Sequence, residues 1–577
     1  MMNRVQKVVT LLAVLFTGAV AIAQVGRGWS DWPTPYADAQ RTSWLRTDPK
    51  ISVEALSKSG FELQWTSKLD ELGRKSQHLT QGVTASGVTL FVPVSLLAGA
   101  NSLYMLDNDT GHIIWSRAFE QTPAPAGPCS GGIAAAPTRI VSGIAEPTSP
   151  PVAPAPQPPG PNQQGYRSLL GEPGEGSPIE VRTAGRGGPP GPPGAAARPG
   201  AGPAPGGPPA RPPAPPIPGA PNANAGGLGR AMVSYLVTGD GQLHVVGLQS
   251  GKDLQKPAPF LPPNSRWSDP LAVGTMMYAA TSGDCGGAPN AVYAIDLDAP
   301  HKPVVSYQTG GGSIVGSVAF SSDGTTLLAA IGPGSAKGDG KANAIVALDP
   351  ITLRLKDWFT QPTAEFVTGP TVFRHGTKDV VAAATKDGRV ILLDAASLGG
   401  ARHDTPLLIS PALFESGGSI SAKAVATWAR LIGATAGTRT EARSLLVPIS
   451  GRPAGARSTN GPIRSGAVVA LRVAETNGKF SLEPDWTSND LLQPATPIIV
   501  NGVVFALSTG QAPAAGRNSS AAVLYAYDGT SGKALWNSAS SMTAPATSGS
   551  YWSGLSQVYV GTDDGTVHTF GFLDERR

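Results

Sequence analysis

One short theme recurs along the 577-residue chain: an alternating apolar strand that ends near an Asp, a turn, and a second strand that carries an aromatic residue. The clearest copies are LYMLDNDTGHIIW at residues 103–115 and LYAYDGTSGKALW at residues 524–536. Hydrophobicity alternates with a period of two inside each copy, and the copies recur every few tens of residues. One such unit cannot bury both of its faces alone. The pattern therefore predicts an all-β fold, a β-propeller of four-stranded antiparallel blades.

Six further segments fit the same frame, which makes eight third strands. They are VYAIDLDAPHKPVVSY from Val292, IVALDPITLRLKDW from Ile345, VILLDAASLGG from Val390, VVALRVAETNGKFSLEPDW from Val468, LHVVGLQSGK from Leu243 and VHTFGF from Val567. The last copy stops before a fourth strand, whereas FELQWTSKL at residues 61–69 is a fourth strand with no blade before it. We predict that this N-terminal strand completes the C-terminal blade, which gives an eight-bladed ring without exposed edges.

Two residue types of the frame have structural roles that need no ligand. We expect the Asp residues to bond turn backbones after the third strand; they are Asp107, Asp296, Asp349, Asp394 and Asp528. We expect the fourth-strand aromatic rings to pack between neighbouring blades; they are Trp65, Trp115, Tyr307, Trp358, Trp486 and Trp536.

The frame Ala-x-Asp-x-x-(Thr/Ser)-Gly-Lys-x-x-Trp, nearly complete at residues 526–536, resembles the pyrroloquinoline quinone (PQQ) repeat. Families that share this repeat include the PQQ-dependent alcohol and sugar dehydrogenases and the non-catalytic propeller lipoprotein of the bacterial outer-membrane assembly machine. The segment DWPTPYADAQRTSW at residues 31–44 is also similar to the stretch that precedes the first strand in the quinoprotein dehydrogenases. The resemblance covers residues 30–577 apart from one insertion, and it implies the fold far more specifically than an activity.

The ends and the composition predict an exported protein. Residues 1–23 have the basic start, apolar stretch and Ala-Ile-Ala cleavage site of a signal peptide, so we expect cleavage near Ala23 and a periplasmic or secreted chain. No Cys follows that site and no other segment is long and apolar enough to span a bilayer, so we expect neither a lipid anchor nor a membrane span. The net charge of +4 gives no reason to expect nucleic-acid binding.

We predict four parts of the chain: the signal peptide at 1–23, a segment at 24–60 that packs on the propeller, the propeller at 61–577, and an insertion at 146–229. The insertion is rich in Pro, Gly and Ala and has no apolar periodicity. Such a segment buries too little surface to offset its ordering entropy, so we expect it to be disordered or extended. It falls between the first and second strands of blade 2.

A binding site is expected where the first strands begin, at one mouth of the channel. Long loops between second and third strands lie on that face; they begin at Ser282, Gly332, Gly451 and Thr509. Polar and aromatic residues near this mouth form the candidate ligand-binding set: His78, Gln81, Arg266, Trp267, Asp269, Glu365, Lys423 and Gln493. Three of them have a plainer alternative: His78 as a solvated histidine, Asp269 as a turn cap and Trp267 as a packing residue.

The dehydrogenase resemblance implies an aromatic floor under the quinone, a calcium ion held by hard oxygen ligands and a carboxylate base. Trp267, Asp269 and Glu365 stand in plausible places for these parts. The chain has no adjacent Cys pair and no Cys-x-x-Cys-His for an attached haem. No unambiguous Asp and Asn pair can be aligned, so no catalytic residue and no metal ligand is assigned.

The two cysteines, Cys129 and Cys285, lie on the same predicted face. An exported chain with an even number of cysteines favours a disulfide between them, which would tie two adjacent blades together.

The sequence thus predicts an exported, non-catalytic propeller that acts as a binding or scaffolding module through its loop-rich face, for a protein or carbohydrate ligand and without a cofactor. The alternative is a PQQ- and calcium-dependent alcohol or sugar dehydrogenase in which Trp267 stacks on the quinone and Asp269 or Glu365 helps to hold calcium. A third hypothesis is a non-catalytic propeller that keeps an affinity for PQQ. The sequence names neither the partner nor the oligomeric state.

Overall fold

The computed structural model describes residues 31–69, 79–85, 92–120, 135–141, 232–283, 285–299, 301–334, 340–361, 363–420, 422–435, 438–455, 459–511 and 519–572. The chain divides into two compact units, of which the first comprises residues 1–155 and 217–577. The second unit, residues 156–216, lies outside the described residues, as do the predicted signal peptide at 1–23 and the predicted insertion at 146–229.

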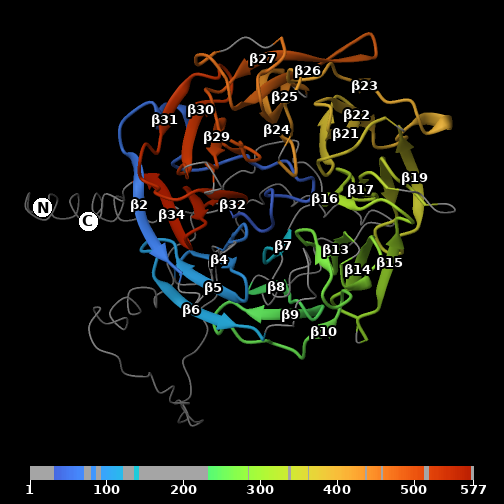
Figure 1. The fold of residues 1–577 in the computed structure, drawn as a ribbon, viewed down its shortest axis with the longest axis vertical. Helices are drawn as coiled ribbons and strands as arrows, with labels where there is room; N and C mark the ends of the chain where they lie inside the picture. Colours follow the sequence, from blue (N-terminus) through green and yellow to red (C-terminus); the bar gives the residue numbers. More distant parts are fainter. Residues whose placement is uncertain are drawn as a thin grey trace, which may run out of the picture. The chain divides into compact units, whose positions relative to one another are not determined.

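The first unit confirms the predicted eight-bladed propeller, with antiparallel blades arranged as a ring in Figure 1. Blade 1 contains β3 (Val83–Ala85), β4 (Val94–Ala98), β5 (Ser102–Asp107) and β6 (Ile113–Ala118). Blade 2 contains β8 (Val233–Val237), β9 (Gln242–Gly247) and β10 (Ala258–Pro259), and Thr138 joins its inner edge through a bridge to Tyr235. Blade 3 contains β12 (Leu271–Val273), β13 (Met276–Ser282), β14 (Ala291–Asp296) and β15 (Val304–Gln308). The short strands β7 (Ile140–Val141) and β11 (Arg266–Trp267) pair with β12 and β13.

The remaining blades follow the same order from the channel outwards. Blade 4 contains β16 (Ile314–Phe320), β17 (Leu327–Ile331), β18 (Ala344–Leu348) and β19 (Leu355–Thr360). Blade 5 contains β20 (Thr371–His375), β21 (Lys378–Ala384), β22 (Val390–Asp394) and β23 (Leu408–Ile409). Blade 6 contains β24 (Ala426–Thr435), β25 (Thr438–Ser450), β26 (Gly466–Thr476) and β27 (Lys479–Thr487). Blade 7 contains β28 (Ile498–Val500), β29 (Val503–Ser508), β30 (Val523–Asp528) and β31 (Ala534–Asn537), with β1 (Trp44–Leu45) parallel to β28.

Blade 8 is closed by the N-terminal strand, as predicted. It contains β32 (Ala546–Gly554), β33 (Gln557–Thr562) and β34 (Thr566–Phe572), and its outer position is taken by β2 (Phe61–Lys68). The antiparallel register places Thr66 opposite His568 and Phe61 opposite Phe572. Segments at opposite ends of the described chain therefore share one sheet, which leaves the ring without an open blade.

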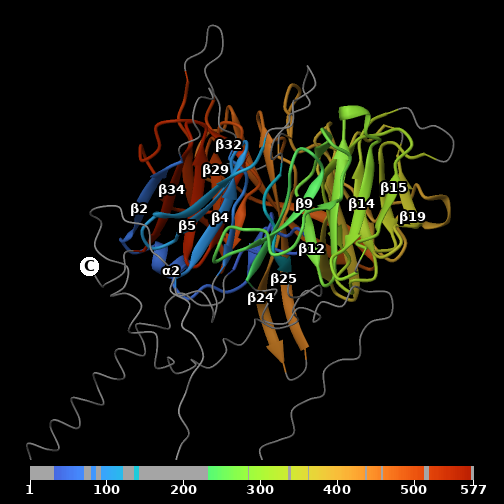
Figure 2. The same cartoon turned by 90° about the horizontal axis from the view of Figure 1, so that it is seen from below.

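Blade 6 departs from the regular frame. Its first two strands are long, β24 extending to Thr435 and β25 beginning at Thr438, with Leu431 opposite Glu441. Figure 2 shows this hairpin projecting beyond the other blades. The helical elements are short: α2 (Val53–Leu56), η2 (Cys285–Gly287) and η3 (Gly400–Arg402). None of the helices in the described ranges could cross a membrane.

The repeat residues have the two structural roles predicted for them. All five frame Asp side chains accept the backbone N–H two residues later, at 2.7–3.1 Å; the donors are Asp109, Asp298, Ile351, Ala396 and Thr530. The Trp115 ring packs on the turn of blade 2, where Gly251 has φ +66° and an added Cβ would lie 2.9 Å from the indole. The frame glycine is therefore required by both the left-handed turn and the ring above it.

Candidate functional site

The N-terminal segment at residues 31–45 crosses the end of the channel opposite the predicted mouth. Backbone N–H groups of six blades donate to its carbonyl oxygens; the donors are Thr84, Arg139, Phe320, Val372, Thr427, Ile499 and Asn501. These hydrogen bonds involve residues near the C-terminal ends of the first strands, such as Phe320, the last residue of β16. Blade 3 joins through the Pro270 carbonyl, which accepts from the Thr34 hydroxyl at 3.3 Å. We call this segment the channel floor.

The channel floor is held in an unusual backbone conformation. Tyr36, Ala37, Arg41 and Ser43 all have positive φ angles, of 64°, 74°, 60° and 56°. Each such non-glycine residue costs about 1–2 kcal/mol, so the surrounding contacts must outweigh the strain. Strain of this kind concentrates at functional sites, which makes the floor the first place to look for one.

Arg41 is the centre of the floor. Its side chain is 1% exposed and donates to the carbonyls of Val318 at 2.9 Å and Pro35 at 2.6 Å, and to the Thr34 hydroxyl at 3.0 Å. Longer contacts reach the carbonyls of Asp269 and Pro270 at 3.4 and 3.3 Å. Burial lowers the pKa of Arg41 to about 10, while the Asp269 carboxylate opposes that shift. The guanidinium is thus a buried cation held mainly by neutral oxygens.

Two predicted residues, Gln81 and Asp269, meet this floor. Gln81 accepts the Tyr36 backbone N–H at 2.9 Å and donates to the Tyr551 carbonyl at 2.6 Å. Burial raises the pKa of Tyr36, and the Asp269 carboxylate raises it further whereas Arg41 opposes the rise. The Asp269 side chain accepts the Ala136 N–H at 3.4 Å.

Tyr36 and Arg41 were missed at the sequence level. Both lie inside DWPTPYADAQRTSW, whose resemblance to the quinoprotein dehydrogenases was the one available signal. Nothing in that stretch indicates that it crosses the channel, because its backbone hydrogen bonds with the blades join residues 52 to 456 positions apart.

The other predicted residues do not join this cluster. Glu365 forms an ion pair with Lys386 at 2.8 Å, Lys423 is exposed, and Gln493 is exposed with a φ of 50°. Arg266 is exposed, whereas its neighbour Trp267 is 5% exposed and packs in the hydrophobic cluster of blades 2 and 3. The Trp267 indole N–H is buried without a hydrogen-bond partner among the described residues. His78 lies outside them.

The described residues do not fit a calcium-bound quinone. Asp269 is accompanied by the buried Arg41 cation, which repels a second cation, and Glu365 is already paired with Lys386. Trp267 is covered by packing, so its ring offers no open face. No group of three or more His, Cys, Asp or Glu suited to a metal occurs within the described ranges. We therefore derive no chemical step through quinone or calcium.

Cys285 begins η2 in the long loop of blade 3 and is disulfide-bonded. Cys129, its predicted partner, lies outside the described residues.

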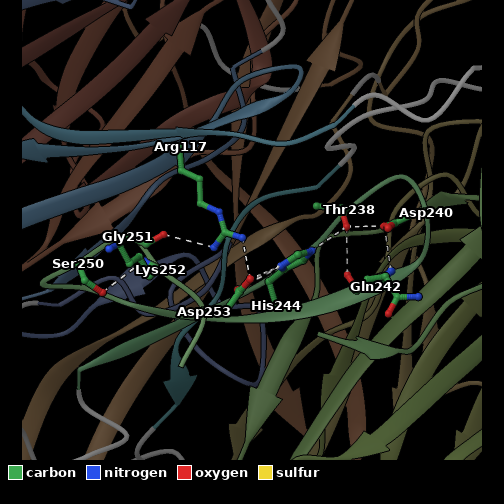
Figure 3. A network of polar contacts seen from close by, with 9 residues as sticks. All are labelled: Arg117, Thr238, Asp240, Gln242, His244, Ser250, Gly251, Lys252 and Asp253. Atoms are coloured by element: carbon green, nitrogen blue, oxygen red, sulfur yellow. Dashed lines mark hydrogen bonds and ion pairs between the residues drawn. The ribbon is translucent and has the colours of Figure 1, made fainter. Parts of the chain in front are cut away.

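A second polar cluster lies between blades 1 and 2 (Figure 3). Asp253 contacts Arg117 at 2.6 Å and His244 Nδ1 at 3.1 Å, and His244 Nε2 lies 3.1 Å from the Thr238 hydroxyl. Burial alone would raise the pKa of Asp253, but hydrogen bonds from Arg117 and His244 lower it overall. The Asp–His–Thr order is that of a hydrolytic triad.

This cluster is structural, because the Thr238 hydroxyl is not poised to attack a substrate. Thr238 is 4% exposed, and its hydroxyl donates a hydrogen bond to the Asp240 carboxylate at 2.6 Å instead of to His244. The adjacent pocket of about 390 Å³ is lined by Trp115, Ser116, Arg117, Ser250, Gly251, Lys252 and Asp253, and does not include Thr238.

Comparison with solved structures found several that are similar to this chain. Quinohemoprotein alcohol dehydrogenase ADHIIG from Pseudomonas putida HK5 is 12% identical over 95% of this chain and 81% of its own, with a TM-score of 0.50. Quinohemoprotein alcohol dehydrogenase from Comamonas testosteroni is 14% identical over 96% and 82%, with a TM-score of 0.49. BamB from Moraxella catarrhalis is 13% identical over 89% and 100%, with a TM-score of 0.40. No family model and no curated protein matches the sequence.

At these identities the comparisons establish the fold and not the activity. The eight-bladed ring, the Asp turns and the N-terminal closing strand are those expected from the PQQ-repeat resemblance. The chain is thus an eight-bladed β-propeller, similar in fold to the quinohemoprotein alcohol dehydrogenase of Pseudomonas putida HK5.

Proposed function

We propose that this protein is an exported binding module without catalytic activity, which receives a ligand through the loop-rich mouth of its channel. The observation that carries the proposal is Arg41, a fully buried guanidinium beside Asp269. Asp269 is one of the two carboxylates that the dehydrogenase alternative would use to hold calcium, and the buried Arg41 cation beside it disfavours a second cation. The disulfide at Cys285 supports export, because such bonds persist in oxidising compartments.

The deciding experiment is calorimetric titration of the mature protein with PQQ, with and without calcium, followed by dye reduction on mixed alcohols and sugars. A binding module gives no dye reduction, whatever its affinity for the quinone. Calcium-dependent PQQ binding together with turnover would contradict the proposal and establish the dehydrogenase instead.

Asp269→Asn is the matching variant. We expect it to lower the free energy of unfolding by about 2 kcal/mol, because Arg41 would lose its nearby carboxylate while staying buried. Chemical denaturation measures that loss. Glu365→Gln, which removes only an exposed ion pair with Lys386, serves as the control and should cost less than about 0.5 kcal/mol.

A further inference from the structure

The side chain of Asn460 bridges blades 6 and 7. Its amide group donates to the carbonyls of Thr487 in β27 and Gly532 in the turn of blade 7, at 2.9 and 2.8 Å. Its Oδ1 atom accepts the Ala534 backbone N–H at 3.3 Å. The residue before it, Thr459, makes two 3.3 Å contacts with Thr487, and in each the backbone N–H of one residue donates to the hydroxyl of the other. A two-residue segment from the long loop of blade 6 therefore fills the groove between these blades.

The groove between blades 1 and 2 has the same frame. The two grooves can be aligned on the frame tryptophan and the glycine of the next turn, which are in contact in both places. The residues bonded by Asn460 then correspond to Ser116, Gly251 and Asp253. All three line the pocket of about 390 Å³ beside the polar cluster of blade 2, and Figure 3 shows Gly251 and Asp253 on its Arg117 side. The described residues thus leave this second groove open.

The backbone N–H of Asp253 points away from its own sheet. Asp253 pairs with Val246, and two backbone hydrogen bonds of 2.9 Å flank the pair; they join Gly247 to Lys252 and Leu254 to Val245. A pair flanked in this way is a non-hydrogen-bonded antiparallel pair, so its own N–H and C=O groups turn outwards. In the filled groove, the matching N–H of Ala534 donates to Asn460.

The backbone of Ser116 is oriented in the same way. The Phe119 N–H donates to the Asn101 carbonyl at 2.8 Å, so Ala118 lies in a non-hydrogen-bonded pair of β5 and β6. Bonded and non-bonded pairs alternate along an antiparallel ladder, and Ser116 is two residues away without a bulge between them. Its N–H and carbonyl therefore face outwards, as those of Thr487 do in blade 6.

The Gly251 carbonyl is the second acceptor of the open groove. It accepts Arg117 Nη1 at 3.3 Å, which uses one of its two lone pairs. The Asp253 carboxylate is held by Arg117 at 2.6 Å and by His244 at 3.1 Å, so Asp253 offers a ligand mainly its backbone N–H. Two carbonyl acceptors and one N–H donor are the complement of a primary amide, and Asn460 meets that same set between blades 6 and 7.

We propose that the groove between blades 1 and 2 binds an extended peptide segment of a partner protein that presents an asparagine side chain. The asparagine N–H groups donate to the carbonyls of Ser116 and Gly251, and its oxygen accepts the Asp253 N–H. The exposed Ser116 hydroxyl stands where the Thr487 hydroxyl accepts a backbone N–H, so it binds the residue before the asparagine. An aspartate in the same place has no donor for the two carbonyls.

The probe for this site is the blocked peptide Ser-Thr-Asn-Ala-Pro, which carries the Thr-Asn pair of residues 459–460. Saturation-transfer NMR with the mature full-length protein should show saturable binding, with a Kd of about 1 mM or below. Replacing the Asn of the peptide by Asp or Ala should weaken binding at least about tenfold, because two hydrogen bonds to carbonyls are lost.

Variants of the protein locate the binding. Ser116→Phe places a ring beside the groove at an exposed strand position and should weaken binding of the Asn peptide at least about tenfold. The matched control is Ala118→Phe, on the same strand and the same side but outside the pocket lining, which should leave the affinity unchanged. If Ser116→Phe does not fold, Ser116→Val replaces it and should weaken binding about threefold, since it removes the hydroxyl.

Three results would overturn the proposal. One is no binding of the Asn peptide at concentrations up to about 10 mM. Another is binding of the Asp peptide as tight as that of the Asn peptide, because Arg117 and Lys252 would then select an anion in place of an amide. The third is binding that the Ser116 variants leave unchanged, which would place the peptide elsewhere. Failure of the channel proposal leaves these readouts unaffected, since none involves PQQ or dye reduction.

Discussion

Blades 2 and 8 contain the same turn but differ in how the third strand continues. In both, a Thr hydroxyl bonds the Asp two residues later and contacts the Nε2 atom of the His six residues later. The residues are Thr238, Asp240 and His244 in blade 2, and Thr562, Asp564 and His568 in blade 8. In blade 2 the loop after β9 then supplies Asp253 to His244 and Gly251 to Trp115.

Blade 8 has no such loop, because its fourth strand β2 comes from the N-terminal part of the chain. His568 is 6% exposed, and its Nδ1 atom is buried without a hydrogen-bond partner among the described residues. Trp536, which faces this blade, lacks a turn carbonyl for its N–H. Closing the ring with a separate strand removes an open edge but also removes the turn that would satisfy both groups.

The largest expected effect comes from the turn glycine of blade 2. Gly251→Ala combines left-handed strain with a Cβ placed 2.9 Å from the Trp115 ring, so we expect it to lower the free energy of unfolding by about 3 kcal/mol. Chemical denaturation measures the change. The control Gly478→Ala has a similar φ of +76° but no atom within 4 Å, and should cost about 1 kcal/mol. Equal losses in the two variants would show that the Trp115 contact adds nothing.

A direct comparison of the two tryptophans should give the next largest effect. Trp115→Phe leaves the buried Leu248 carbonyl without its donor, so we expect a loss of about 1–2 kcal/mol in denaturation experiments. Trp536→Phe breaks no such bond and should cost less than half as much, since its ring packing on Phe61 and Phe570 is largely kept. A greater loss of stability in Trp536→Phe than in Trp115→Phe would show that blade 8 does provide a hydrogen-bond acceptor for the Trp536 indole N–H.

Asp253 offers a test of the polar cluster in blade 2. Asp253→Ala removes the carboxylate from Arg117 and His244, both half-buried or buried, and should destabilise the fold by about 1 kcal/mol. The exposed ion pair of Asp404 with Arg402 provides the control: Asp404→Ala should change the free energy of unfolding by less than about 0.5 kcal/mol. If Asp253→Ala leaves the free energy of unfolding unchanged, the contacts of Asp253 with Arg117 and His244 do not stabilise the fold.

The smallest effect concerns pH. Burial lowers the pKa of His568 from 6.5, so the folded state binds a proton less readily than the unfolded state does. The stabilisation is present above pH 6.5 and is lost as the pH falls towards the pKa of the folded state. We expect the free energy of unfolding to fall less between pH 7 and 5 in His568→Gln than in the unaltered protein, as measured by chemical denaturation at each pH. Burial also lowers the pKa of His375, so some pH dependence should remain in the variant.

The ring and its closure were predictable because their causes are local and repeated. Period-two hydrophobicity, the Asp that bonds its own turn and the Gly beneath a Trp recur in copy after copy, as in Asp528, Gly532 and Trp486. A fourth strand at residues 61–69 without its own blade was enough to predict the pairing of β2 with β34.

The residues of the candidate sites were predicted less well from the sequence. Of the predicted mouth residues, the described structure brings only Gln81 and Asp269 to the channel floor, and Glu365 pairs instead with the surface residue Lys386. Tyr36 and Arg41 gain their roles from contacts with several blades, which no local pattern records.

The sequence by itself determined the blade number, the roles of the frame Asp and Trp residues and the strand that closes the ring, because the repeat pattern is local and can be counted, and one fourth strand has no blade before it. The tertiary structure alone decided that residues 31–45 cross the channel, that Arg41 is buried beside Asp269, and that Trp536 packs on Phe61 and Phe570 of the closing blade. These features depend on which distant segments meet when the ring closes, and that arrangement is set by the packing of blade on blade.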